Sequence, residues 1–108
     1  MRIVNGSMLR VLTNLNLRKA PATTAPRLVT IQADVLVTAL AAPANGWLRC
    51  VVRGWTHADH PDTIFSEQSV KSSVQARSGG GLGWQYVERI GYASMANPAW
   101  WKIEDGPA

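Results

Sequence analysis

Apolar residues recur at every second position along much of this chain, which is the period of a β-strand with one buried face. Residues 8–13 alternate in this way and are expected to form a first strand. Residues 14–18 continue extended, with Leu15 and Leu17 pointing to one face and the polar residues between them to the other. The chain is therefore predicted to begin with two consecutive strand segments.

A loop and two further strands are expected next. Residues 20–26 contain Pro21 and Pro26, and each proline restricts the residue before it to extended conformations, so this stretch reads as a loop. Between 28 and 39 the apolar positions again follow period two, interrupted at 32–34 by a turn. The valines, isoleucine and threonines of this stretch favour strands over a helix.

Asn45-Gly46 predicts a tight hairpin, because both residues tolerate positive φ angles. Residues 47–55 follow as the next strand. Trp47 begins that strand directly after the hairpin, so we expect its ring to cover one end of the apolar core. Burial of a ring of this size stabilises a fold by several kcal/mol at about 25 cal/mol per Å².

The polar stretch after this strand permits two structures. Val70 and Val74 are four residues apart, as on one face of a short surface helix, and a protruding β-hairpin arm fits the same residues. Residues 78–83 are rich in glycine and are expected to form a flexible joint. Residues 58–83 are thus predicted to be an inserted loop or arm.

The end of the chain is expected to complete a single domain over residues 1–108. Order returns at 84–90, and 91–94 is expected to turn into a last extended segment at 100–104. Residues 105–108 are expected to be a tail.

The first half of the chain resembles the bacterial SH3 family. The matching residues are Leu15-Asn16-Leu17-Arg18, Pro21, Leu28–Ile31, Val37–Leu40 and Asn45-Gly46-Trp47. The family's closing glycine–aromatic motif has two candidates here, Gly54-Trp55-Thr56 and Gly91-Tyr92-Ala93-Ser94. The resemblance covers about residues 9–52 and is ambiguous afterwards. It implies an all-β fold, a small SH3-like barrel with an inserted polar arm or loop.

Three departures from the family pattern bear on the loops. Ala20 and Asp34 stand where the family has glycine. Aspartate tolerates a left-handed turn and alanine does not, so the loop after Ala20 is expected to differ in shape. The third departure is the long segment between Trp55 and Trp84, and an insertion of that length is usually functional or disordered.

Composition and charge narrow the possible partners. The chain has 108 residues, enough for one modest core, and Lys plus Arg exceed Asp plus Glu by 11 − 7 = 4. The basic residues are scattered and accompany no nucleic-acid motif, which indicates a solvated basic surface without specific nucleic-acid recognition. No apolar run approaches the ~18 residues that span a bilayer, and the start lacks a leader pattern. A complete chain is therefore expected to be cytoplasmic or virion-associated.

Catalytic and metal chemistry find little support in the sequence. Cys50 is the one cysteine, which excludes an internal disulfide, and strand alternation gives no reason to bring it to His57. His57 and His60 lie beside Asp59, but without further ligands they indicate a solvated loop more than a metal site. The glycines at 79–83 lack the Lys-Ser/Thr of a phosphate loop. We therefore expect no enzyme activity, no metal and no cofactor.

Large aromatic rings are numerous for so small a core, so some must lie at the surface. They are Trp47, Trp55, Trp84, Tyr86, Tyr92, Trp100 and Trp101. Trp47, Trp84 and one of the Trp100/Trp101 pair are expected in the core, whereas exposed rings are typical of binding grooves and interfaces.

The resemblance implies a non-catalytic module that binds a peptide, a cell-wall component or a protein partner. Trp55, Tyr92 and Trp101 would then be stacking surfaces, with Asn16 and Arg18 shaping the loop beside them. The alternative is a structural subunit of a larger assembly, such as a phage virion component, that uses the inserted arm for contacts between subunits of a homo-oligomer.

Overall fold

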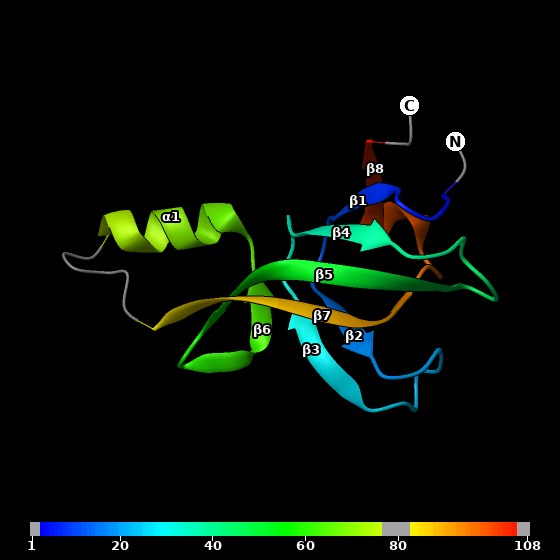
Figure 1. Ribbon diagram of the computed structural model, residues 1–108, viewed down its shortest axis with the longest axis horizontal. Coiled ribbons are helices and arrows are strands. Elements are labelled where there is room, and N and C mark those ends of the chain that lie inside the picture. The colour runs from blue at the N-terminus through cyan, green and yellow to red at the C-terminus, as the bar shows by residue number, and fades with distance from the viewer. Residues whose placement is uncertain (1–2, 77–82, 106–108) are drawn as a thin grey trace.

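The computed structural model describes residues 3–76 and 83–105, which form an almost entirely β protein (Figure 1). The strands are β1 (Met8–Val11), β2 (Leu15–Arg18), β3 (Arg27–Ile31), β4 (Leu36–Ala39), β5 (Trp47–His57), β6 (His60–Phe65), β7 (Trp84–Ser94) and β8 (Trp101–Asp105). The helices are α1 (Glu67–Ala76) and the short 3-10 helix η1 (Pro98–Trp100). The strand segments expected at the start of the chain, before and after the 32–34 turn, and after the hairpin are confirmed.

Five of the strands close into a barrel, in the order β6-β3-β2-β7-β5 and back to β6. The closing strand is β6, which pairs in parallel with β3 and antiparallel with β5. The two longest strands, β5 and β7, pair along their whole lengths, from Trp47 opposite Ser94 to His57 opposite Trp84. The predicted fold class, a small all-β SH3-like barrel, is confirmed.

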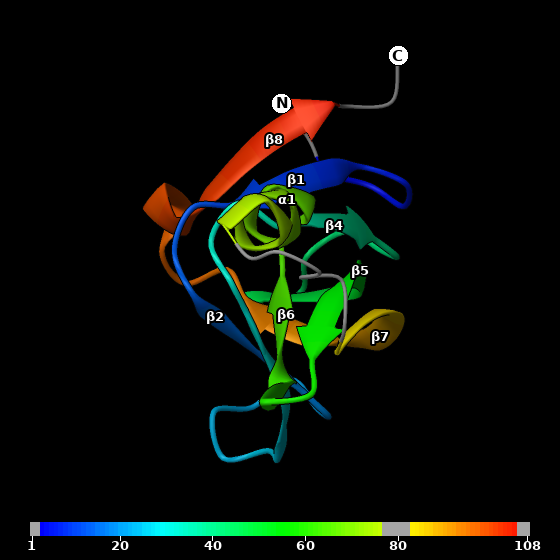
Figure 2. The same cartoon turned by 90° about the vertical axis from the view of Figure 1, so that its left-hand side faces the viewer.

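The sheet continues beyond the barrel because β5 pairs with two different strands along the edge opposite β7. Its middle, at Cys50–Val52, pairs with β4, whereas its end pairs with β6. β1 then pairs with β4, and β8 pairs with β1 as the outermost strand (Figure 2). The strands β7-β5-β4-β1 therefore form one continuous sheet.

The core is aliphatic and is built by strict alternation. On β5 the side chains of even number point inward and are buried, whereas those of odd number face out, with Val51 alone covered on that side. The largest fully buried side chains from several strands are Leu9, Val11, Leu17, Ile31, Val37, Leu48, Val52 and Ile64. Each contributes about 1.5–3 kcal/mol on burial, which makes this cluster the main source of stability.

Two glycines, one from each of the sequences 54–56 and 91–94, lie where strands approach each other closely. A Cβ at Gly54 would meet Ile64 Cγ2 and lie 2.9 Å from the carbonyl oxygen of Phe65, so β6 can cross β5 only over a glycine. A Cβ at Gly91 would lie 2.7 Å from the carbonyl oxygen of Arg18, where β2 meets β7. Each glycine therefore serves a different junction of the barrel.

The predicted turns have the expected backbone. Asn45 (φ 54°) and Gly46 (φ 81°) are both left-handed at the hairpin before β5. Asp34 (φ 76°) adopts the left-handed conformation expected of it, and its N–H donates to the carbonyl of Val11 at 2.7 Å. Aspartate reaches this conformation more readily than most residues other than glycine.

The structure differs from the expectations for the second half in three places. Residues 91–94 continue β7 instead of turning, because Gly91 is needed where β2 crosses that strand. Within the expected insertion 58–83, residues 60–65 form the barrel strand β6 and residues 67–76 the helix α1, while 77–82 lie outside the described residues. Asp105, expected in the tail, ends β8.

Candidate functional site

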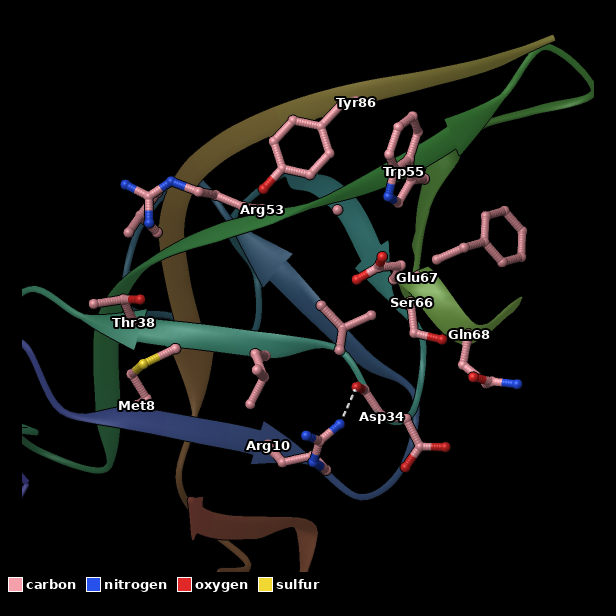
Figure 3. Close-up of a pocket in the computed structure, with 15 residues that line it drawn as sticks. Met8, Arg10, Asp34, Thr38, Arg53, Trp55, Ser66, Glu67, Gln68 and Tyr86 are labelled. Carbon is pink, nitrogen blue, oxygen red and sulfur yellow. Dashed lines mark hydrogen bonds between the residues drawn. The ribbon is translucent and has the colours of Figure 1, made fainter. Parts of the chain in front are cut away.

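An open groove of about 550 Å³ lies on the outer face of the β7-β5-β4-β1 sheet (Figure 3). The strands supply one side, and the turn before β4 and the first turn of α1 supply the ends. Its lining residues are Met8, Arg10, Asp34, Val35, Leu36, Thr38, Val51, Arg53, Gly54, Trp55, Phe65, Ser66, Glu67, Gln68 and Tyr86. We call this hollow the Trp55 groove.

An aromatic pair forms one wall of the Trp55 groove. Trp55 and Tyr86 face each other across β5 and β7, with ring centroids 5.1 Å apart and planes at 69°. Tyr86 is 56% exposed, the most exposed of the large apolar side chains described. An edge-to-face pair of this kind is a rigid surface for another ring or an apolar side chain.

The floor of the groove is apolar because odd-numbered residues of β5 and even-numbered residues of its neighbours share the outer face. Val51 is buried there although it points away from the barrel core, and Met8 and Leu36 line the groove beside it. Ile90, opposite Val51 on β7, extends the apolar surface and is 50% exposed. An exposed apolar side chain beside partly buried ones gives this face apolar surface for a ligand to pack on.

Two arginines border this floor, and each is held by a surface ion pair. Arg53 Nε donates to Glu88 at 2.8 Å, and Arg10 Nε donates to Glu104 at 2.8 Å. Arg10 also donates through Nη1 to the carbonyl oxygen of Asp34, at 2.8 Å (Figure 3). Because a guanidinium carries five N–H donors, both arginines keep donors for a ligand carboxylate or carbonyl.

The first turn of α1 closes one end of the groove. Ser66 caps the helix, since its hydroxyl accepts from the N–H of Ser69 at 3.2 Å. This cap fixes Glu67 and Gln68 at the groove (Figure 3), where they add an acceptor and an amide to its rim. The Trp55 groove thus combines an aromatic wall, an apolar floor and polar groups of both charges.

A second hollow, of about 350 Å³, lies beside β2 and gathers two of the residues expected at the site. Asn16 and Arg18 line it together with Trp47 and Trp100, both partly buried. Arg18 Nη1 donates to the carbonyl oxygen of Ala25 at 3.0 Å, so this side chain holds the loop after β2, in keeping with its expected effect on the loop.

Asn16, also expected to shape the loop, bonds to a neighbouring strand, and Asn14 makes the bond to backbone. Asn14 Oδ1 accepts from the N–H of Ala33 at 2.9 Å, whereas Asn16 Oδ1 accepts from the hydroxyl of Thr30 at 3.3 Å. Asn16 lies within β2 opposite Thr30, so its side chain meets the neighbouring strand and not the loop.

The structure separates the three aromatic residues expected to stack on a ligand. Trp55 lines the Trp55 groove. Tyr92 on β7 is not part of that lining, and it pairs with Arg18 on β2 and with Arg49 on β5. The expectation for Trp101 is wrong: its ring is 8% exposed, and its Nε1 donates to the carbonyl of Ser94 at 3.0 Å. Trp101 is therefore a core residue, because β8 folds over β1 with this face inward.

Titratable groups outside the groove are poorly placed for nucleophilic chemistry. Cys50 is fully buried on β5, and burial raises the pKa of its thiol to about 12. His57 lies at the far end of the same strand, seven residues on, roughly 23 Å away along an extended chain. Within residues 3–76 and 83–105, no three His, Cys, Asp or Glu side chains gather closely enough to hold a metal ion.

Sequence reasoning missed several residues of the groove. Met8, Arg10 and Arg53 join it from separate strands, and Tyr86 joins it because β7 pairs with β5 in the register that sets Tyr86 opposite Trp55. The alternation of aromatic residues at 84 and 86 is the one local signal of an exposed aromatic face. The other groove residues come together only through the order of the strands, which depends on long-range pairing.

The described residues include no helix long and apolar enough to cross a membrane. No family model matches this chain, and no curated protein or solved structure matches it either.

Proposed function

We propose that this chain is a non-catalytic binding module of the bacterial SH3 type that takes an extended segment of a peptide, a cell-wall component or a protein partner in the Trp55 groove. The observation that carries the proposal is the pair of the half-buried Trp55 and the exposed Tyr86 beside an apolar floor on an open sheet face. An apolar or aromatic group of the ligand packs on this pair. Arg53 and Glu67 then bind polar groups on either side of it.

The shape of the groove favours an extended chain over a compact small molecule. The lining runs across several strands from Met8 on β1 to Tyr86 on β7, and it is open to solvent along that path. Compact ligands are usually bound in concave pockets that bury most of their surface. An open groove with a rigid aromatic anchor instead resembles the sites where peptide segments lie across a preformed surface.

The lining offers a ligand hydrogen-bonding groups as well as apolar surface. Its fifteen described residues include carboxylates and hydroxyls but neither histidine nor cysteine. The buried Cys50 thiol, with its raised pKa, is outside the groove and is not a nucleophile at neutral pH.

Tryptophan fluorescence with a panel of short peptides and soluble cell-wall fragments tests this function. Truncation of an exposed anchor residue usually costs 1 kcal/mol or more, so Tyr86→Ala is expected to weaken binding by about tenfold. Leu12→Ala is the matched control, since Leu12 is a large apolar residue, 46% exposed, that lines neither the Trp55 groove nor the hollow beside β2. Equal loss in both variants, or none in Tyr86→Ala, contradicts the proposal.

A second candidate function is the structural subunit of an assembly. It is favoured by Ile90, exposed beside the groove, and by β8, whose outer edge pairs with no other described strand. Open edges and exposed apolar faces both invite contacts between subunits. Light scattering after size-exclusion chromatography separates the two candidates: one species near 11.7 kDa at all concentrations favours the module, and a discrete larger oligomer favours the subunit.

A further inference from the structure

A row of arginines crosses the outer face of the barrel. Arg27 on β3 pairs with Arg18 on β2, and Arg18 pairs with Tyr92 on β7. Tyr92 pairs in turn with Arg49 on β5. These strands are neighbours in the sheet (Figure 1), and adjacent strands lie about 4.8 Å apart, so the row spans roughly 14 Å. We call these four residues the arginine row.

The side chains of the arginine row share the outer face. The odd-numbered side chains of β5, Arg49 among them, face out, and residues directly opposite each other in antiparallel strands point to the same side of a sheet. Tyr92 and Arg18 therefore face out as well. Arg27 is exposed, and it remains on this face despite the register shift before Arg18, since its Nη1 donates to Thr30, whose side chain points away from the core.

The arginine row lacks the acidic partners that other arginines of this fold have. Arg10 and Arg53 each donate to a glutamate at 2.8 Å. No carboxylate whose side chain the structure describes forms an ion pair with an arginine of the row. Arg18 and Arg27 lie directly opposite each other, and like charges in such positions destabilise a sheet. An anionic ligand on the row offsets this repulsion.

The guanidinium groups keep N–H donors for such a ligand. Arg18 and Arg27 each use Nη1, on the carbonyl oxygen of Ala25 and on the hydroxyl of Thr30, which leaves the other N–H groups of each. Arg49 is exposed and makes no side-chain hydrogen bond to the described part of the chain. The fork of a guanidinium matches the oxygens of a phosphate group, so phosphates suit this row.

Aromatic rings adjoin the arginine row. Arg18 lines the hollow beside β2 together with Trp47 and Trp100. Trp47 lies two residues before Arg49 on β5, so its ring is on the same outer face. Proteins that bind single-stranded nucleic acid combine a basic track for the backbone with rings on which bases stack. A ligand with both phosphates and flat rings therefore fits this surface better than an acidic peptide, which offers only carboxylates.

We propose that the arginine row binds a single strand of nucleic acid without sequence preference. The phosphates of the strand bind Arg27, Arg18 and Arg49, and one base enters the hollow beside β2 and stacks on Trp47 or Trp100. The cations involved are scattered in the sequence, and only the order of the strands gathers them. None of the four residues of the row lines the Trp55 groove, so neither proposal depends on the other.

Fluorescence anisotropy of a labelled, short oligothymidine at several salt concentrations tests this proposal on the full chain. Each phosphate contact of a single strand contributes about −0.7 to the slope of log K against log salt, so three contacts predict a slope of about −2. Arg49→Gln should weaken binding several-fold and make the slope shallower by about 0.7. Lys71→Gln is the control, since it removes the same charge from an exposed position on α1 and should leave the slope unchanged.

Two further ligands separate nucleic acid from other polyanions. An abasic strand of the same length keeps the phosphates and should bind at least about fivefold more weakly, because one stacked base contributes 1–3 kcal/mol or so. Polyglutamate should also bind more weakly. The proposal is overturned if the oligothymidine does not bind at low salt, or if Arg49→Gln and Lys71→Gln weaken binding equally. It is also overturned if the abasic strand or polyglutamate binds as tightly as the oligothymidine.

Discussion

Replacement of Gly54 by alanine tests how the barrel is closed. The added methyl would meet Ile64 Cγ2 and lie 2.9 Å from the carbonyl oxygen of Phe65, whereas ordinary contacts begin near 3.4 Å. Ile64 is fully buried and cannot swing out to solvent. β6 must therefore recede from β5 by about half an ångström, which also disturbs the 2.9 Å bond from the N–H of Gln32 to the carbonyl of Ile64.

The expected cost follows from overpacking. Insertion of one methyl into a tightly packed site usually costs 1–3 kcal/mol, and we expect the upper part of that range because one of the crowded atoms is backbone. In urea denaturation, Gly54→Ala should lower the free energy of unfolding by about 2–3 kcal/mol. The melting temperature should fall by roughly 4 °C or more for each kcal/mol.

A double-mutant cycle isolates the contact responsible. Ile64→Ala removes Cγ2, so Gly54→Ala should cost clearly less in that background than in the natural sequence. If Gly54→Ala changes the free energy of unfolding by less than about 0.5 kcal/mol, the close crossing of β5 and β6 is refuted.

Three further predictions concern single residues. The Cys50 thiol has a pKa of 9.0 in the unfolded chain and of about 12 in the folded protein, so the free energy of unfolding should fall by about 1.4 kcal/mol per pH unit as the pH rises between these values. Urea denaturation at about pH 8 and pH 10.5 measures this fall. A Cys50→Ala variant with the same pH dependence would contradict the prediction. Trp101→Phe loses the bond to Ser94 and part of a buried ring, and should cost about 1–3 kcal/mol in thermal denaturation; no measurable loss would show that the ring is not structural. The hydrogen bond from Arg10 lowers the pKa of Glu104, so this bond stabilises the fold above the ordinary carboxyl pKa and loses that effect as the pH falls. Arg10→Ala should raise the pKa of Glu104 in an NMR titration. An unchanged pKa would argue against the bond.

Local signals in the sequence predicted the first half of the fold well. Asn45-Gly46 predicted the hairpin because the required φ angles are a property of the two residues themselves. Asp34 likewise occupies the left-handed turn expected of it. Alternation placed Leu15 and Leu17 with their polar neighbours on the correct faces of β2.

Long-range pairing explains what the sequence did not reveal. Gly91 reads locally as a turn residue, but it lies within β7 because the backbone of β2 approaches it there. From the sequence alone, Trp101 could not be told from Trp100 as the ring at the surface. Only the pairing of β8 with β1 shows that Trp101 faces the core. Tyr86 became a site residue through its register opposite Trp55, which no local pattern specifies.

The central claim, that the Trp55 groove is the binding surface, is tested most directly by mapping a bound ligand on the protein. Backbone amide shifts in NMR spectra would be followed on addition of the tightest binder from the peptide and cell-wall panel. We expect the largest changes at Arg53, Trp55 and Tyr86. Changes centred instead on Asn16 and Arg18, in the hollow beside β2, would contradict the claim.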